Sequence, residues 1–291
     1  MSDSLSEARR VERLTLPELP GAVDAVLDTD TYNEIDDQFA LAYMLLSPER
    51  IKLEAVYAAP FVNEHRGADT PGVGMSQSYD EIERVFARMG RGEVSVFRGS
   101  EAWMADVGPV RSAAAGDLIE RAMARDADGP PLYVVAIGAP TNVSSALALR
   151  PEIAERIVVV WLGGQPRDWP HTWEFNGQQD RAATRWLLDC GVPLVRVPCF
   201  NVAQKLRTSV PELSHYLAGK NPLCGFLLER FAEYETFELS PAGWKAKQFP
   251  GQRSDTSSDR SATPRGPRPR SLCNTPSAAR GTAWLSSPPG S

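Results

Sequence analysis

The chain has 291 residues, of which 42% are hydrophobic and 23% are charged, and its formal net charge is −6 at pH 7. A chain of this length can form one large domain with a buried core. The acidic balance argues against a general binder of nucleic acids or of acidic membranes, because such proteins usually carry a basic surface.

The N-terminal residues and the cysteines indicate the compartment. The first twenty residues are polar and charged, without the apolar core of a secretory signal, and no run of about 18 apolar residues occurs in the chain. The four cysteines show no paired C-x-x-C spacing, which favours reduced thiols over disulfides or zinc ligands. We therefore expect a cytoplasmic protein that does not enter membranes, with residues 1–20 as an N-terminal extension.

Short β-branched runs alternate with amphipathic helical segments over residues 22–199. The first expected strand is Val23–Leu27, and a polar loop separates it from a helix over Asp36–Leu46 whose apolar residues recur at helical spacing. Further strands are expected at Leu53–Ala59, Val94–Phe97, Leu132–Ile137, Ile157–Leu162 and Pro193–Val197. Further helices are expected at Tyr79–Met89, Ala113–Arg125, Val143–Leu149 and Arg181–Asp189.

This alternation of strands and helices predicts an α/β fold. Continuous apolar strands such as residues 157–162 suit a sheet that is covered on both faces. We predict a single Rossmann-like domain over residues 21–248, with a doubly wound, mainly parallel sheet flanked by helices. Ligands of such folds bind beyond the carboxyl ends of the strands, so polar residues directly after each strand are candidates for a site.

The composition changes near Phe249. Residues 249–291 contain nine Ser, seven Pro, six Arg and four Gly, and no Lys or Glu. A segment with so few large apolar side chains cannot bury enough surface to offset its ordering entropy, so we predict a disordered C-terminal tail. Arg-, Pro- and Ser-rich sequence also arises when GC-rich coding sequence is read in the wrong frame. We favour a frameshifted or replaced end over a natural tail.

Acidic residues crowd the loop after the first strand, at Asp28, Asp30, Glu34, Asp36 and Asp37. Like charges this close repel one another, and a folded site tolerates them mainly when protons or a cation neutralise them. Because no His or Cys is nearby, the oxygen ligands indicate Ca²⁺ or Mg²⁺ rather than zinc. The structural alternative is that Asp36 and Asp37 complement the N-terminus of a helix.

Polar residues also follow the later strands. Asn63 follows the second strand, Thr141 follows the strand at 132–137, and Glu174 and Asn176 come after the strand at 157–162. Any one of them could be an ordinary turn or cap residue. Their order after successive strands makes them candidates for a site.

Together these segments resemble the inosine–uridine-preferring nucleoside hydrolase family. Asp28-Thr29-Asp30 followed by Asp36-Asp37 is similar to the family's N-terminal signature. Residues 137–142 resemble its Gly-Pro-Leu-Thr-Asn loop, and residues 162–164 and 174–176 resemble its Gly-Gly and Glu-Phe-Asn elements, so the likeness spans roughly residues 23–197. The chain departs from the family at Thr31–Ile35, where the commonest form has a shorter Pro-Gly turn.

The resemblance implies calcium-assisted hydrolysis of the N-glycosidic bond of a ribonucleoside, giving ribose and a free base. It implies that Asp30, Asp37 and the main-chain carbonyl of Thr141 hold the calcium, and that Asp36 is the catalytic base. The residues implied to surround the substrate are Asp28, Asn63, Glu174 and Asn176. It also implies a homodimer or homotetramer. Trp169, His171 and Trp173 are further candidates for contacts with the leaving base.

One ligand of the family has no counterpart in this sequence. The family supplies a final Asp near its C-terminus, often after a His, and here the corresponding region lies beyond Trp244, where the tail replaces it. Asp255 and Asp259 stand in Ser-rich sequence and are poor substitutes. Losing a carboxylate weakens charge compensation in a calcium site. We therefore expect weak or absent activity.

Two alternatives fit parts of the same pattern. Asp28-Thr29-Asp30-Thr31 also fits the Asp-x-Asp-x-Thr motif of haloacid-dehalogenase-type phosphohydrolases, with Asp28 as nucleophile. That family needs an acidic pair after a later strand, whereas here the pair lies in the first loop. The second alternative is a nucleoside- or ribose-binding protein that keeps the pocket without the chemistry.

Overall fold

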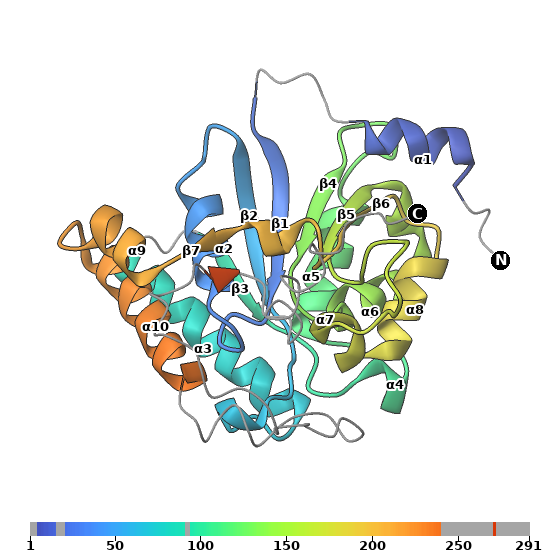
Figure 1. Ribbon diagram of the computed structural model, residues 1–291. Helices are drawn as coiled ribbons and strands as arrows, with labels where there is room; N and C mark the ends of the chain where they lie inside the picture. Colours follow the sequence, from blue (N-terminus) through green and yellow to red (C-terminus); the bar gives the residue numbers. More distant parts are fainter. Residues whose placement is uncertain (1–4, 16–20, 91–93, 240–269, 272–291) are drawn as a thin grey trace, which may run out of the picture.

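The computed structural model describes residues 5–15, 21–90, 94–239 and 270–271 (Figure 1). Its centre is a sheet of six parallel strands in the order β3-β2-β1-β4-β5-β6. The strands are β1 Val23–Thr29, β2 Ile51–Ala58, β3 Ser95–Arg98, β4 Leu132–Ala136, β5 Ile157–Leu162 and β6 Leu194–Val197. This order is that of a Rossmann fold, in which the direction of winding reverses between β1 and β4. The predicted fold class is confirmed.

Helices cover both faces of this sheet and bury a separate apolar core on each. One core lies under α5 Ala113–Met123, α6 Thr141–Leu149 and α8 Arg181–Asp189. The other core lies under α2 Asp36–Leu45, α3 Pro71–Met89 and α10 Pro222–Leu239. Burial on both faces explains why the central strands are apolar along their whole length.

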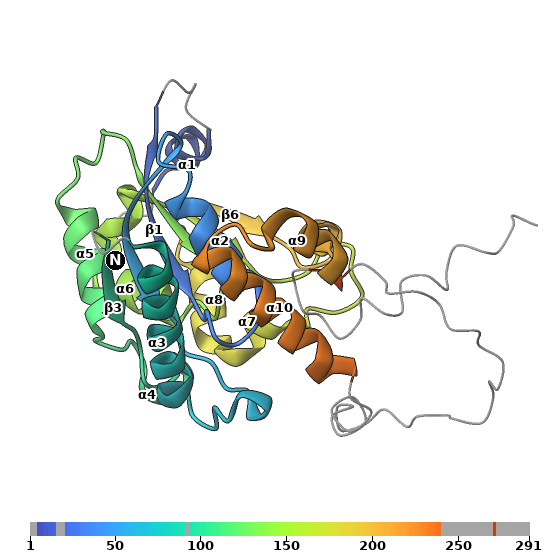
Figure 2. The same ribbon diagram turned by 90° about the vertical axis from the view of Figure 1, so that its left-hand side faces the viewer.

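Two regions differ from the expected elements. Helix α3 begins at Pro71, well before the expected Tyr79, because Thr70 caps it by accepting a hydrogen bond from the Val73 N–H (3.3 Å). Gly74 obscured this start in the sequence, yet it is required there, since a Cβ would lie 1.9 Å from the Phe61 carbonyl oxygen. Helix α10 was not expected and lies beside α3 (Figures 1 and 2).

Helix α10 docks on the α2–α3 face through one buried ion pair and one aromatic contact. Arg230 Nε lies 3.3 Å from Oε1 of Glu81, which is fully buried on α3. Phe231 packs edge-on against Phe39 of α2, with 6.4 Å between ring centres. Glu81 also pairs with Arg84 of α3 (2.8 Å), so the contact with Arg230 adds to the apolar packing that holds α10 on this face.

The remaining elements are an N-terminal helix, a second small sheet and several short helices. The expected N-terminal extension contains α1 Glu7–Leu14, whose Arg13 Nη1 donates to the Gly129 carbonyl (2.6 Å). Strand β7 Arg207–Thr208 pairs antiparallel with β8 Arg270–Ser271. The rest of the tail predicted to be disordered, at 249–269 and 272–291, lies outside the described residues. The short helices are η1 Glu64–Arg66, α4 Met104–Val107, η2 Pro151–Glu155, α7 Phe175–Gln179, η3 Ala203–Lys205 and α9 Val210–Leu217.

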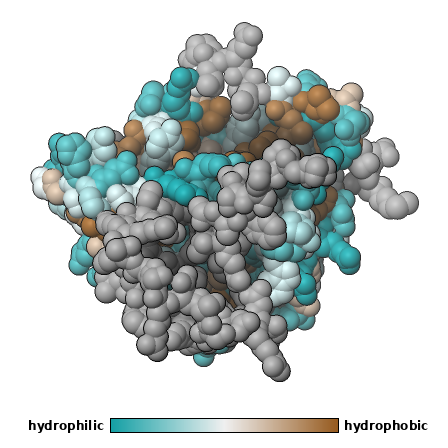
Figure 3. All heavy atoms as spheres, viewed as in Figure 1, coloured by the Kyte–Doolittle hydropathy of each residue, from teal (hydrophilic) through white to brown (hydrophobic). Residues whose placement is uncertain are grey.

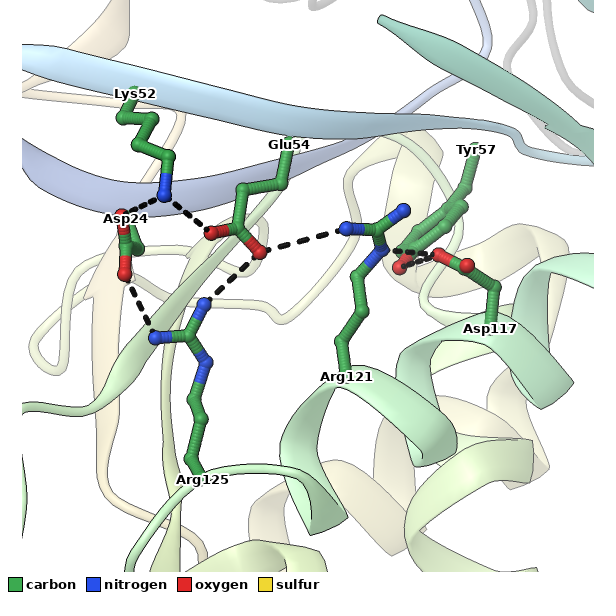
Figure 4. Close-up of polar contacts among 7 residues, drawn as sticks. All are labelled: Asp24, Lys52, Glu54, Tyr57, Asp117, Arg121 and Arg125. Carbon is green, nitrogen blue, oxygen red and sulfur yellow. Dashed lines mark hydrogen bonds and ion pairs between the residues drawn. The ribbon is translucent and has the colours of Figure 1, made fainter.

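An ionic network fastens α5 to the first two strands (Figure 4). Arg125 bridges Asp24 on β1 (2.8 Å) and Glu54 on β2 (2.9 Å). Arg121 Nε binds Asp117 (2.6 Å), which also accepts a hydrogen bond from the buried Tyr57 hydroxyl (2.8 Å). Asp24 and Glu54 lie toward the ends of β1 and β2 remote from the acidic loop, whereas Tyr57 lies in register with Asp28. Because these contacts join the helical layer to the sheet, we assign them a structural role.

No helix among the described residues is long and apolar enough to cross a bilayer. The face seen in Figure 3 intermingles hydrophilic and hydrophobic residues over the part of the chain that is coloured.

Candidate active site

A small pocket opens at the carboxyl ends of β1, β4 and β5, where the winding of the sheet reverses. Its empty volume is about 300 Å³, counted to include the open space at its mouth. Its lining consists mainly of acidic and amide side chains with a few apolar ones: Asp30, Asn33, Glu34, Asp36, Asp37, Ile137, Leu162, Glu174, Phe175, Asn176 and Cys199. This is the place where open α/β sheets bind their ligands.

The acidic loop forms one wall of the pocket. Asp30 follows β1, and its backbone carbonyl accepts a hydrogen bond from the Asn33 N–H (2.8 Å), which turns the chain toward α2. Asp36 and Asp37 are the first residues of α2, and no side chain caps that helix. Their carboxylates are therefore placed where the helix N-terminus favours negative charge. The structural alternative for this pair and a role in the pocket are compatible.

Burial dominates the electrostatics of this wall. It raises the pKa of Asp30 well above the ordinary value, and the charges of Asp37 and Asp36 raise it further. Burial and the charge of Asp37 likewise raise the pKa of Asp36. Burial raises the pKa of Asp37 to about 6, although the Thr29 hydroxyl donates a hydrogen bond to it. The Asp36 Oδ1 atom is buried and has no hydrogen-bond partner in the part of the chain that the structure describes. A buried cluster of carboxylates is stable mainly when protons or a bound cation neutralise its charge.

Asp28 lies behind the pocket and does not line it. Its Oδ1 accepts a hydrogen bond from Asn142 Nδ2 (2.9 Å), while its Oδ2 is buried and finds no hydrogen-bond partner among residues 5–15, 21–90, 94–239 and 270–271. Burial raises the pKa of Asp28 to about 7. Asn142 Oδ1 in turn accepts from the Ser100 N–H (2.8 Å). Asp28 thus connects β1 to α6 rather than reaching the space where a ligand would lie.

Glu174 and Asn176 form the opposite wall. Glu174 caps α7, and its Oε1 accepts a hydrogen bond from the Gly177 N–H (2.6 Å). Burial raises its pKa against the opposing effect of nearby backbone N–H groups. Asn176 Nδ2 donates to the carbonyls of Ile137 and Leu162, at 2.9 Å each, and so joins the ends of β4 and β5. Both residues are held rigidly at the pocket.

Two more candidates stand outside the lining. Asn63 Nδ2 donates to Asn33 Oδ1 (2.9 Å), so it reaches the pocket only through Asn33. Thr141 is the first residue of α6, fully buried, and its hydroxyl donates to Asp180 Oδ2 (2.9 Å). Asp180 also caps α8 by accepting from the Ala183 N–H (3.1 Å). Thr141 is thereby fixed where β4 leads into α6.

Known proteins share this arrangement of strands. The chain matches the family model described as inosine-uridine preferring nucleoside hydrolase over residues 25–250. The chain belongs to this family. A search of curated proteins finds no match.

Solved nucleoside hydrolases are among the structures similar to this family member. The plant nucleoside hydrolase PpNRh1 enzyme is 18% identical, with 74% of this chain and 72% of that chain covered and a TM-score of 0.58. The purine-preferring ribonucleoside hydrolase from Gardnerella vaginalis is 22% identical, covers 75% and 74%, and has a TM-score of 0.57. The type III effector protein XopQ, solved with adenosine diphosphate ribose, is 21% identical, covers 85% and 77%, and has a TM-score of 0.56. At these identities the likeness shows a shared fold.

This nucleoside hydrolase has pocket residues that the sequence did not single out, notably Asn33 and Cys199. Asn33 stands in the segment that departs from the family pattern, where no motif assigns it a role. Cys199 follows β6, and its Sγ lies 3.9 Å from Glu174 Oε2. Its position directly after a strand could have marked Cys199 as a candidate site residue, but no motif surrounds it. Among the described residues, no group of three His, Cys, Asp or Glu side chains that could hold a metal ion is found.

The aromatic candidates for contacts with the leaving base, Trp169, His171 and Trp173, lie in the segment between β5 and α7. The Trp169 ring stacks on Phe200, with 4.2 Å between ring centres, and His171 lies perpendicular to it at 6.2 Å. The Trp169 ring thus has a packing partner in Phe200. Trp173 is 52% exposed.

Proposed function

We propose that this chain hydrolyses the N-glycosidic bond of ribonucleosides with the help of calcium, releasing ribose and a free base. The observation that carries the proposal is the meeting of Asp30, Asp36 and Asp37 with Glu174 and Asn176 around one pocket. The family places these residue types around the ribose. The acidic pair in the first loop fits this reaction better than a haloacid-dehalogenase mechanism, which needs the pair after a later strand.

The donor atoms of the pocket suit a hard cation. The three aspartates of the acidic wall offer oxygen atoms, burial raises their pKa values, and Asp36 Oδ1 has no hydrogen-bond partner among the described residues. Asp30, Asp37 and the Thr141 carbonyl would hold calcium, although the described acidic side chains are not grouped as a finished metal site. Bound calcium would supply a positive charge that orients a water molecule and anchors the ribose hydroxyls.

Asp36 is the proposed general base. Its buried carboxyl has a raised pKa, and its Oδ1 atom has no hydrogen-bond partner among the described residues, so it can accept a proton from a water molecule held in the pocket. Glu174 and Asn176 would bind the ribose hydroxyls from the opposite wall. Because both are fixed by backbone hydrogen bonds, they hold the sugar in place before the bond breaks. Asn63 and Asp28 support the site from behind through Asn33 and Asn142.

We further propose that turnover by this chain is weak. The final carboxylate that the family contributes would come from beyond Trp244, a region outside the described residues, and the sequence there offers only Asp255 and Asp259. A calcium site with one carboxylate fewer binds its ion less tightly and positions water less well. A ribose-binding protein without catalysis is the outcome expected if this loss is complete.

The deciding experiment measures free base and reducing sugar released from inosine, uridine and guanosine by the purified full chain, with calcium or with chelator. ADP-ribose joins the panel because XopQ was solved with it. The Asp36→Asn variant is the matched control, since it keeps the shape and removes the base. Slow, calcium-dependent release that Asp36→Asn abolishes supports the proposal. Release that is insensitive to both chelator and Asp36→Asn refutes the mechanism, and vigorous turnover refutes the impairment.

The origin of residues 249–291 has a separate test. If the tail is a frameshift, another reading frame of the gene past codon 248 should encode apolar strand- and helix-like sequence with a carboxylate. Absence of such sequence in both other frames would refute the frameshift. Where one is found, the chain with the restored frame should release base faster than the chain that ends in the Ser- and Pro-rich tail.

A further inference from the structure

Asn33 donates hydrogen bonds to Asp30 from both its backbone and its side chain. It is 1% exposed and lines the pocket. Its N–H donates to the Asp30 carbonyl (2.8 Å), and its Nδ2 donates to Asp30 Oδ2 (2.9 Å). The other carboxylate oxygen, Asp30 Oδ1, faces Gly138, where a Cβ would come within 2.7 Å of it. The Asp30 carboxylate is therefore held between a donor on one side and the β4–α6 loop on the other.

The direction of the Asn33 amide is set by a relay of hydrogen bonds. An Asn side chain turned by 180° keeps its shape but exchanges donor and acceptor, so its partners decide its orientation. The His65 N–H, which can only donate, donates to Asn63 Oδ1 (3.0 Å). This leaves Asn63 Nδ2 to donate to Asn33 Oδ1 (2.9 Å), and hence leaves the Asn33 NH₂ group for Asp30.

Arg66 joins the loop after β1, which contains Asn33, to the loop after β2, which contains Asn63. Its Nε donates to the Asn33 carbonyl (3.0 Å), and its guanidinium lies 5.2 Å from the ring centres of both Tyr32 and Tyr234. Tyr234 belongs to α10, so the loop after β1, the loop after β2 and α10 meet at this arginine. With the backbone of Asn33 fixed in this way, its side chain has little freedom other than rotation of the amide.

We infer that Asn33 is a positioning residue that orients the Asp30 carboxylate in the pocket, and that Asn63 acts on the site only by fixing the direction of the Asn33 amide. This role belongs to the segment in which the chain departs from the family's commonest pattern. The inference rests on the proposed function, because the oriented carboxylate is one that would hold calcium. Partners that orient a ligand commonly change metal affinity by about 10- to 100-fold when they are removed.

The test is a double-mutant cycle on the full chain with calcium alone as the probe. Calcium affinity is measured by calorimetric titration for wild type, Asn33→Ala, Asn63→Ala and the double variant. Ser112→Ala is the control for lost stability, because Ser112 caps the remote helix α5 by accepting from the Ala115 N–H (3.1 Å). We expect Asn33→Ala to weaken calcium binding about tenfold or more, Asn63→Ala to weaken it less, and Ser112→Ala to leave it unchanged.

Non-additivity separates positioning from a general structural role. The double variant should bind calcium as Asn33→Ala does, since Asn63 has nothing left to orient. Wild-type affinity in Asn33→Ala, or losses that add in the double variant, would overturn the inference. If wild type binds no calcium, the proposed function fails. The inference about Asn33 is then tested by itself, by comparing crystal structures of the metal-free wild type and Asn33→Ala. Asp30 should then adopt other orientations in Asn33→Ala, and an unmoved carboxylate would overturn it.

Discussion

Replacing Gly138 by alanine should displace Asp30 without straining the backbone. Gly138 has no positive φ, so its main chain accepts any residue. The added Cβ would lie 2.7 Å from Asp30 Oδ1 and 3.3 Å from the Ala59 Cβ, whereas ordinary contact begins at 3.4 Å. The carboxylate oxygen must therefore withdraw by the difference between 3.4 and 2.7 Å, or 0.7 Å.

This withdrawal has a cost because Asp30 is not free to move. The residue is 2% exposed, and its Oδ2 is hydrogen-bonded to Asn33. Forcing extra volume into a filled site typically costs about 1–3 kcal/mol, and a misplacement of about 1 Å in a catalytic constellation can cost on the order of 10²-fold in rate. We expect the Gly138→Ala variant to lose about 1–3 kcal/mol of unfolding free energy and to bind calcium at least about tenfold more weakly.

Urea denaturation and calorimetric titration with calcium measure the two effects. Gly116→Ala is the matched control, because Gly116 lies inside α5 and no atom lies within 4 Å of the Cβ that it would gain. Alanine in a helix interior should add roughly 0.5–1 kcal/mol of stability and leave calcium binding unchanged. The reasoning is refuted if Gly138→Ala matches wild type in both unfolding free energy and calcium affinity.

Three further predictions test the site and its frame. Calcium at 100 times its dissociation constant should raise the unfolding free energy by about 2.7 kcal/mol, seen as a higher melting temperature that chelator reverses; an unchanged melting temperature would speak against the metal site. Burial raises the pKa of Glu174 in the folded chain above the ordinary carboxyl value of about 4.3. The folded chain therefore holds this proton more tightly than the unfolded chain, and the unfolding free energy falls as pH rises from about 4.3 through the pKa of the folded state. Glu174→Gln should therefore be more stable than wild type at pH 8 but equal to it near pH 4, and a constant gap across pH would contradict this. Tyr57→Phe, which deletes the buried hydroxyl bound to Asp117, should cost about 1–2 kcal/mol in urea denaturation, against roughly zero for Tyr43→Phe, whose side chain is 68% exposed; equal costs would contradict the network's role.

Local pattern was sufficient to predict the sheet and most of its helices. The strand at Ile157–Leu162 and the helix at Arg181–Asp189 are found with the expected bounds, because a continuous apolar run and a regular helical period each leave an unambiguous signal. The strand–helix alternation also predicted the parallel, doubly wound sheet. The predicted start of α3 was wrong, because glycines in its first turn indicate a loop when only the sequence is considered. The reason for Gly74 is tertiary, since a Cβ there would collide with the Phe61 carbonyl.

The acidic wall of the pocket was similarly predictable, because four of its carboxylates lie in one short loop of the sequence. What tertiary structure decided is which side chains face that wall. Glu174 and Asn176 meet the aspartates only because β5 lies next to β4 and β4 next to β1, an adjacency that no local pattern records.

Tertiary structure also decided the place of Asp28 and Asn33, which share the acidic loop but differ in what they face. Asp28 accepts a hydrogen bond from Asn142 of α6 and does not line the pocket, while Asn33, which carries no charge and no motif, lines the pocket and donates a hydrogen bond to Asp30. Sequence by itself determined the acidic character of the site and the strands that carry it, since charge and periodicity are properties of the chain. The direction of each side chain was decided by packing between segments far apart in sequence, because hydrogen bonds such as that from Asn63 to Asn33 exist only once the loops meet.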